Sequence, residues 1–159
     1  MIKLDQRDIA ILRVLAENGR ISKAALAARV GLSPTPCWNR LKRLEEKGLI
    51  ERFEARINLK KLGPYVMVFV AVELADHTAA SFHRFEEAMQ RHDEVMACWA
   101  LGGGFDYFLQ IVTKDIEAYQ SLIDDMLEAR IGLARYFTYI VTKPVKISST
   151  PPMEVLLDL

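Results

Sequence analysis

A chain of 159 residues, of which 51% are hydrophobic and 26% charged, can form one ordinary globular domain or two small ones. Its longest apolar run, residues 66–72, is about seven residues long, whereas a membrane-spanning helix needs roughly twenty, so we expect no membrane partner. Because the amino terminus shows no signal peptide and two cysteines cannot form a disulfide framework, we expect a cytoplasmic protein.

The net charge of zero hides an asymmetry along the chain. Residues 1–63 contain 14 Lys and Arg against 7 Asp and Glu, whereas residues 64–159 contain 7 against 14. A basic first part followed by an acidic remainder favours a polyanion-binding head. Surface charge that serves only solubility is the alternative, because net charge alone is a weak argument for a partner.

Two short helices are predicted at the start of the basic part. Residues 4–18 show the 3.6-residue apolar period of an amphipathic helix, with Asp5 as the N-cap and Gly19 as the stop. Ser22 caps a second helix, and Gly31 ends it.

A third helix is predicted from Ser33 although two prolines follow closely. With Ser33 as the N-cap, Pro34 and Pro36 fall in the first turn, where backbone N–H groups have no partner within the helix. An apolar stripe on this helix consists of Cys37, Leu41 and Leu44. The polar side chains outside the stripe are Asn39, Arg40, Lys42 and Arg43. Three short helices with a basic outer face on the third predict a helix-turn-helix.

The outer face of the third helix is the candidate DNA-binding surface. Arginine can pair with a phosphate or read guanine in the major groove, whereas a solvated face with a Lys42–Glu46 salt bridge is the alternative. Ser33 and Thr35 can bond phosphate at the helix N-terminus, although Ser33 can also act simply as a cap. Trp38 either touches the sugar–phosphate wall or packs inside the head, and the sequence favours neither.

The segment after the third helix changes its period. Residues 49–59 alternate apolar and polar side chains, which predicts a half-buried strand that can be a wing, a linker or a pairing edge for a second subunit. Residues 60–64 end in Gly-Pro, and the charge balance reverses there. We therefore predict one domain over residues 1–63 and a second over residues 64–159.

The second domain alternates strands and helices. Its predicted strands are residues 65–74, 95–101, 107–113 and 133–141, and its predicted helices are residues 79–91 and 116–129. The order βαββαβ is the ferredoxin-like arrangement, with both helices on one face of an antiparallel sheet, so the fold class is α+β. Because the strand residues are nearly all apolar, the other face needs a partner, and we expect a homodimer of stacked sheets.

Cysteine and histidine give no sign of a metal or redox centre. Cys37 and Cys98 have the spacing of small buried hydrophobes, although a redox role for Cys98 stays open. His77, His83 and His92 lack cysteine or acidic partners at ligand spacing, so we predict no metal site.

Two segments resemble the Lrp/AsnC family of feast/famine regulators. Residues 30–50, with the sequence VGLSPTPCWNRLKRLEEKGLI, are similar to the family's proline-containing recognition helix. Residues 103–107, GGFDY, resemble the Gly-x-x-Asp-Tyr loop of its ligand-sensing domain. Order, spacing and length agree from Leu4 to about Ser148. The resemblance implies a winged-type helix-turn-helix, a connecting strand and a βαββαβ sensor (RAM) domain.

The resemblance also implies a function and partners. We expect a bacterial or archaeal, nucleoid-associated regulator that binds specific double-stranded DNA near genes of amino-acid metabolism or transport. An amino-acid effector, no cofactor, and a homodimer that assembles into a tetramer or octamer are expected as well.

The loop between the second and third strands of the sensor is the candidate effector site. Backbone N–H groups of Gly102, Gly103 and Gly104 can cradle a carboxylate, while Asp106 receives an ammonium group; a flexible hairpin is the alternative. By position in the family, the residues that line the same cleft are Leu101, Tyr107, Thr138 and Ile140. Tyr107 can equally belong to the core.

Two other classes of function remain as alternatives. The chain can be a ligand-binding or scaffolding module, or the regulatory domain of an enzyme, without specific DNA binding. It is not expected to be an enzyme itself, because no nucleophile–base pair and no paired carboxylates are recognisable, and no catalytic residue is predicted.

Overall fold

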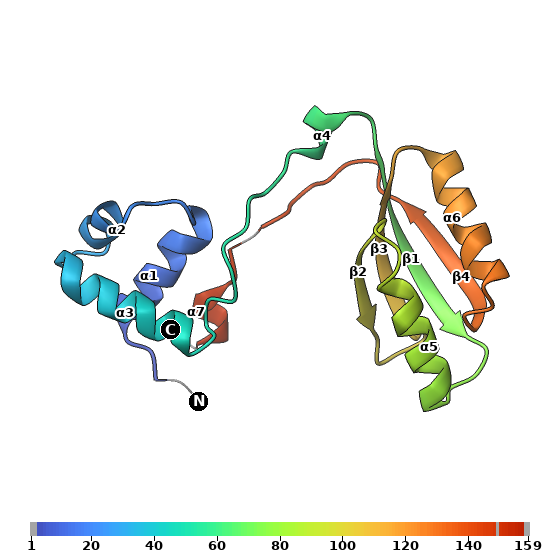
Figure 1. Ribbon diagram of the computed structural model, residues 1–159, viewed down its shortest axis with the longest axis horizontal. Coiled ribbons are helices and arrows are strands. Elements are labelled where there is room, and N and C mark those ends of the chain that lie inside the picture. The colour runs from blue at the N-terminus through green and yellow to red at the C-terminus, as the bar shows by residue number, and fades with distance from the viewer. Residues whose placement is uncertain (1–2, 149, 158–159) are drawn as a thin grey trace. The chain divides into compact units, whose positions relative to one another are not determined.

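The computed structural model describes residues 3–148 and 150–157 and divides the chain into two compact units (Figure 1). One unit comprises Met1–Arg56 together with Val145–Leu159, and the other comprises Ile57–Pro144. The predicted boundary differs from this division in two ways. The segment before the sheet belongs to the second unit, and the C-terminal segment returns to the first.

Three helices form the first unit: α1 (Gln6–Glu17), α2 (Lys23–Arg29) and α3 (Pro34–Glu46). Their predicted N-caps are confirmed. Asp5 accepts hydrogen bonds from the first turn of α1, and Ser22 accepts one from the first turn of α2. Ser33 has the extended backbone of an N-cap but makes no side-chain cap bond, and prolines follow it in the first turn of α3.

The helices pack on a small apolar core. The predicted stripe on α3 is buried, with Cys37 at 2%, Leu41 at 7% and Leu44 at 0% exposure. These side chains meet Ile11 of α1 and Leu26 of α2 in one cluster. The polar side of α3 is thereby directed away from the core.

The C-terminal segment contributes one turn of helix, α7 (Met153–Leu156), to the same unit. An ion pair of 2.7 Å joins Arg13 of α1 to Glu154 of α7, with both side chains largely exposed. We predicted from the sequence that this segment belongs to the second domain. A helix of one turn is too short for an apolar period that would indicate which core it packs against.

The strand predicted over residues 49–59 does not form. Residues 51–58 have no regular secondary structure and are exposed, and a short helix, α4 (Leu59–Leu62), follows them. The side chains of Phe53 and Ile57 are 51% and 59% exposed. An alternating pattern can become a strand only beside another strand, and within the described part of this chain none pairs with this segment.

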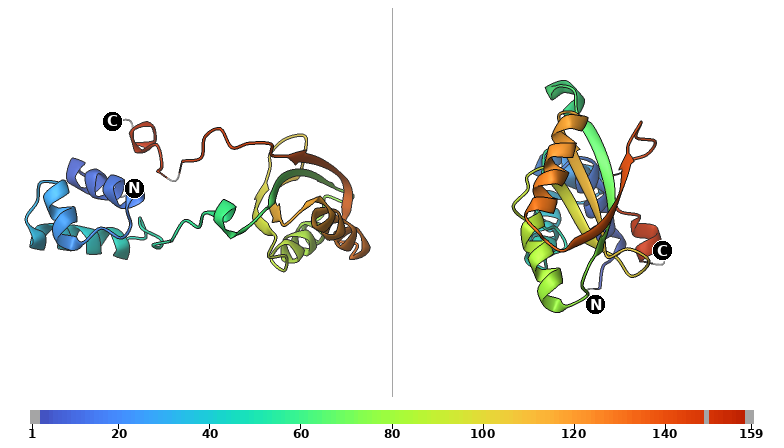
Figure 2. Two further views of the ribbon diagram at one scale, coloured as in Figure 1. Left: turned by 90° about the horizontal axis from the view of Figure 1, so that it is seen from above. Right: turned by 90° about the vertical axis from the view of Figure 1, so that its right-hand side faces the viewer.

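The second unit has the predicted ferredoxin-like order. Its elements are β1 (Val66–Leu74), α5 (Ala79–Met89), β2 (Val95–Ala100), β3 (Tyr107–Thr113), α6 (Ile116–Glu128) and β4 (Leu133–Ile140). The four strands form one antiparallel sheet in the order β2-β3-β1-β4. Both α5 and α6 cover the same face of this sheet, as the two further views in Figure 2 show. The predicted α+β fold class is confirmed.

The core of the second unit lies between the sheet and its helices. Val68, Val70 and Val72 of the central strand β1 point to the helices and are at most 1% exposed. Phe85 of α5 and Met126 of α6 are completely buried against them. The alternate residues of each strand therefore form the other, helix-free face of the sheet. No described helix is long and apolar enough to cross a membrane.

Candidate functional site

The polar face of α3 presents most of the predicted DNA-binding residues to solvent. Those that are exposed are Ser33, Thr35, Trp38, Asn39, Lys42 and Arg43, whereas Arg40 is half-buried. The apolar stripe on the opposite side holds this face outward. Lys42 forms the anticipated salt bridge with Glu46, at a distance of 3.6 Å. The two side chains are 62% and 63% exposed, so this salt bridge is weak and Lys42 stays accessible.

Two arginines of α3 are tied to the start of α1. Arg40 Nη1 lies 2.9 Å from Oδ1 of Asp8 and 2.5 Å from Oδ2 of Asp5, and Arg43 Nη2 lies 2.5 Å from the other oxygen of Asp8. The side chain of Asp8 is 1% exposed and also accepts the backbone N–H of Asp5 in a capping box. Arg40 and Arg43 therefore connect two helices, a structural role that the sequence pattern did not reveal.

This cluster also shifts acid–base equilibria. The backbone N–H of Asp8, and then the guanidinium of Arg40, donate to Asp5 and lower the pKa of its carboxyl. The same hydrogen bonds, first with Asp5 and then with Asp8, raise the pKa of Arg40. Asp5 and Arg40 thus hold each other in their charged forms.

Lys23 is a cation beside α3 that sequence reasoning missed. It is the first residue of α2, and its Nζ lies 3.2 Å from the centroid of the Trp38 ring. Trp38 is 37% exposed, so the ring is accessible while a cation–π contact holds it. A lysine fifteen positions earlier in the sequence carries no local signal of this contact.

In the second unit, Asp106 is held firmly at the end of β1. Its backbone N–H donates to the carbonyl of Val72 over 2.9 Å, and its Oδ2 accepts the N–H of Leu74 over 2.8 Å. The imidazole Nε2 of His77 lies 3.0 Å from Oδ1 and 3.2 Å from Oδ2. The carboxylate is 16% exposed, and therefore still reachable from solvent.

The glycines before Asp106 form an open loop. Gly102, Gly103 and Gly104 are exposed, none has a positive φ, and an added Cβ would meet nothing within 4 Å. No backbone hydrogen bond among the described residues engages their N–H groups. This chain alone therefore does not require glycine here, and the loop's donors are free for a second molecule.

Tyr107 belongs to the core rather than to an open cleft. It is 3% exposed, its ring centroid lies 4.6 Å from that of Phe85, and its hydroxyl donates to Glu86 over 2.8 Å. Burial first, and then this carboxylate, raise the pKa of Tyr107 far above its usual range. The sequence allowed Tyr107 to lie either in the effector cleft or in the core, and in the structure it lies in the core.

The two β4 residues do not join the loop within this chain. Thr138 pairs with Val70 and Ile140 with Val68, whereas Asp106 bonds the far end of β1. At about 3.3 Å per residue, Ile140 is on the order of 13 Å along the sheet from the level of Val72. Thr138 shares a hydrogen bond with the hydroxyl of Tyr119 on α6. Of the predicted effector residues, the loop brings together only the exposed Leu101, the three glycines and Asp106.

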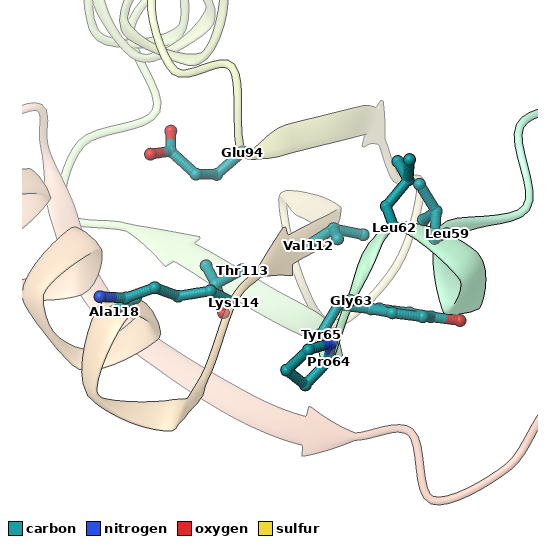
Figure 3. A pocket seen from close by; sticks show the side chains of 10 residues that line it. All are labelled: Leu59, Leu62, Gly63, Pro64, Tyr65, Glu94, Val112, Thr113, Lys114 and Ala118. Carbon is teal, nitrogen blue, oxygen red and sulfur yellow. The ribbon is translucent and has the colours of Figure 1, made fainter.

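A pocket of about 500 Å³ lies at the opposite end of the sheet, where β1 begins and β3 ends (Figure 3). Its lining residues are Leu59, Leu62, Gly63, Pro64, Tyr65, Glu94, Val112, Thr113, Lys114 and Ala118. It is open on one side, and none of the predicted effector residues lines it. Among the described residues, no group of three His, Cys, Asp or Glu is placed to hold a metal ion.

Aromatic side chains cover the helix-free face of the sheet. Phe69 of β1 and Phe108 of β3 stack with ring centroids 5.3 Å apart. Around them Trp99, Phe137 and Tyr139 are 47%, 40% and 53% exposed. This surface is the unpartnered apolar face anticipated from the strand composition.

Comparison with known proteins agrees with both units. A family model described as winged helix-turn-helix DNA-binding matches residues 4–51, and one described as the Lrp/AsnC ligand binding domain matches residues 67–151. The transcriptional regulatory protein DoeX of Halomonas elongata is 47% identical over 91% of this chain and 92% of its own. The leucine-responsive regulatory protein of Escherichia coli K12 is 38% identical over 92% of this chain and 89% of its own.

A solved structure extends the agreement to three dimensions. The transcriptional regulator NMB0573 of Neisseria meningitidis, solved as a complex with L-Met, superposes with a TM-score of 0.91 at 32% identity, over 97% of this chain and 99% of the other. These relatives are transcriptional regulators and not enzymes, so a DNA-binding domain and a ligand-binding domain account for both units. The chain belongs to the Lrp/AsnC family of transcriptional regulators.

Proposed function

We propose that this regulator binds specific sites on double-stranded DNA through the exposed face of α3, and that an amino acid bound beside Asp106 changes its DNA affinity or its assembly. The single observation that carries the proposal is the orientation of α3. Its apolar stripe is buried, and its polar side chains point outward from a helix-turn-helix of the required size. Genes of amino-acid metabolism or transport are the proposed targets.

The DNA contacts divide into two kinds. Asn39 and Lys42, exposed on the middle of α3, are suited to base edges and nearby phosphates. Thr35 at the start of α3, and Lys23 held over Trp38, are suited to phosphate. Arg43 is 46% exposed and can contact DNA while it remains paired with Asp8. Arg40 acts mainly by positioning α3 against α1, which differs from its predicted role as a contact.

A salt titration tests the DNA contacts. The logarithm of the affinity for duplex from the gene's own upstream region should fall linearly with the logarithm of salt concentration, because phosphate neutralisation releases counterions. Lys42→Ala should lower that slope by about one if Lys42 contacts a phosphate. Lys114→Ala is the matched control, since Lys114 is also exposed and also weakly paired, but lies on the second unit. Equal slopes for wild type and both variants would contradict the assignment of α3.

An amino-acid effector is supported by the chemistry of the loop. A carboxylate at one end and free N–H donors at the other match the ammonium and carboxylate groups of an α-amino acid. The relative from Neisseria was solved with L-Met. At one hundred times its dissociation constant a ligand adds about 2.7 kcal/mol to the free energy of unfolding. Thermal melts against the twenty amino acids should therefore show a shift that Asp106→Asn abolishes.

A second copy of the chain is the proposed cover for the aromatic sheet face. We propose a dimer of stacked sheets, with tetramers or octamers built from it, that acts on nucleoid DNA in the cytoplasm. Trp99→Glu, which puts a charge into this face, should lower the sedimentation coefficient at micromolar concentration. Leu127→Glu is the control, because Leu127 is 42% exposed but lies on α6. A dimer that survives the first change and dissociates with the second would exclude this face.

A further inference from the structure

The carboxylate of Asp106 already has a partner within this chain. His77 Nε2 lies within hydrogen-bond distance of both carboxylate oxygens, at 3.0 and 3.2 Å. The backbone N–H of Leu74 donates a hydrogen bond of 2.8 Å to one of those oxygens and fixes the carboxylate in place. An ammonium group that approaches Asp106 from solvent therefore meets an imidazole at the atoms it would bind.

The two partners differ in how freely they can move. Asp106 is 16% exposed and is anchored through its side chain and its backbone. His77 is 65% exposed and lies in the segment between β1 and α5, with the ring of Phe82 6.0 Å away, centroid to centroid. An exposed ring can turn into solvent at little cost. Displacement of the pair thus means movement of His77 and not of Asp106.

We propose that His77 competes with the effector for Asp106: it occupies the carboxylate in the absence of effector, and a ligand that carries an ammonium group must displace it. This inference rests on the proposed effector role of Asp106. Carboxylic acids of the same shape that lack the amine leave the His77–Asp106 pair in place, so His77 weakens the binding of amino acids and not that of their deaminated analogues.

The charged groups of the neighbouring elements have other partners. Glu73 of β1 pairs with Arg135 of β4 at 2.5 Å, and Glu86 of α5 accepts the hydroxyl of Tyr107. Asp76, adjacent to His77 in sequence, is exposed. Among the described residues, His77 is the only basic side chain in a salt bridge with Asp106.

Calorimetric titration with L-methionine tests the inference. His77→Gln should bind methionine more tightly than wild type, by up to roughly fivefold, the size expected for an exposed pair. His83→Gln is the matched control and should behave as wild type, because His83 makes a similar exposed pair, 3.2 Å from Glu87. Equal or weaker binding by His77→Gln would overturn the inference.

Two further arms separate this inference from the proposed function. The deaminated analogue 4-(methylthio)butanoate should bind wild type more weakly than methionine, and His77→Gln should increase that ratio, because only methionine has to displace the imidazole. Methionine binding that needs Asp106 but ignores His77 overturns the inference alone. No methionine binding to either form overturns the effector role of Asp106. The pair itself is checked without ligand, since Asp106→Asn should move the imidazole ¹⁵N signals of His77 and not those of His83.

Discussion

The buried carboxylate of Asp8 offers a direct test of how the head is held together. Asp8→Asn keeps the shape of the side chain but removes its charge and turns an amide NH₂ toward two guanidinium groups. The Asp8 side chain is 1% exposed, and it pairs with both Arg40 and Arg43. The change therefore leaves two cations facing a site that no longer neutralises them.

The magnitude follows from the burial of each partner. Removal of one member of a fully buried ion pair costs about 3–5 kcal/mol. Here Arg40 and Arg43 are 30% and 46% exposed, so water can solvate both after the change. We expect a loss of about 2 kcal/mol in the free energy of unfolding of the first unit, which corresponds to a fall of roughly 8–16 °C in its Tm.

Urea denaturation followed by circular dichroism at the helix minimum measures this loss. Asp125→Asn is the control, because it removes an exposed helical carboxylate from α6 in the other unit. Arg40→Ala should also destabilise, and the double variant should lose less than the sum of the two single changes by about 1 kcal/mol. A cost below about 0.5 kcal/mol for Asp8→Asn, or strict additivity in the cycle, would refute the reasoning.

Three other outcomes are expected. The pKa of Asp5 in the folded protein lies below its ordinary value. The contribution of Asp5 to the stability of the first unit is therefore present above about pH 4 and is lost as the pH falls through the lowered pKa. Asp5→Asn should flatten this acid part of a curve of stability against pH. Burial, and then Glu86, raise the pKa of Cys98 to about 11, so its thiol should react with iodoacetamide far more slowly at pH 8 than free cysteine; an equal rate would contradict its half-buried position. Phe85→Ala empties a fully buried site and should cost about 3–5 kcal/mol in the unfolding of the second unit by chemical denaturation; a change below about 1 kcal/mol would mean that the site is not packed as described.

Much of the fold was predictable because its determinants are local. The caps Asp5 and Ser22, the prolines after Ser33 and the apolar stripe of α3 act within one or two turns of helix, so their positions in the sequence are sufficient. The strands of the second unit were predictable to within about one residue for a similar reason, since runs rich in apolar, aromatic and β-branched residues bounded by polar turns need no distant information.

The candidate sites were only partly predictable because they depend on contacts between distant segments. Arg40 was predicted only as a DNA contact, and its pairing with carboxylates more than thirty positions away had no signal in the sequence. His77 looked like an isolated histidine, yet the path of the chain brings it to Asp106, 29 residues later. The alternating residues 49–59 looked like a strand, yet they had no neighbouring strand in this chain.

The sequence by itself determined which segments become helices and strands, which of their faces are apolar, and which family the chain resembles, because periodicity, caps and composition are properties of neighbouring residues. Only the tertiary structure decided the partners of the charged groups, the burial of Tyr107, and the separation of Ile140 from the glycine loop. A side chain's partner depends on which distant surface the folded backbone places beside it, and no local pattern encodes that placement.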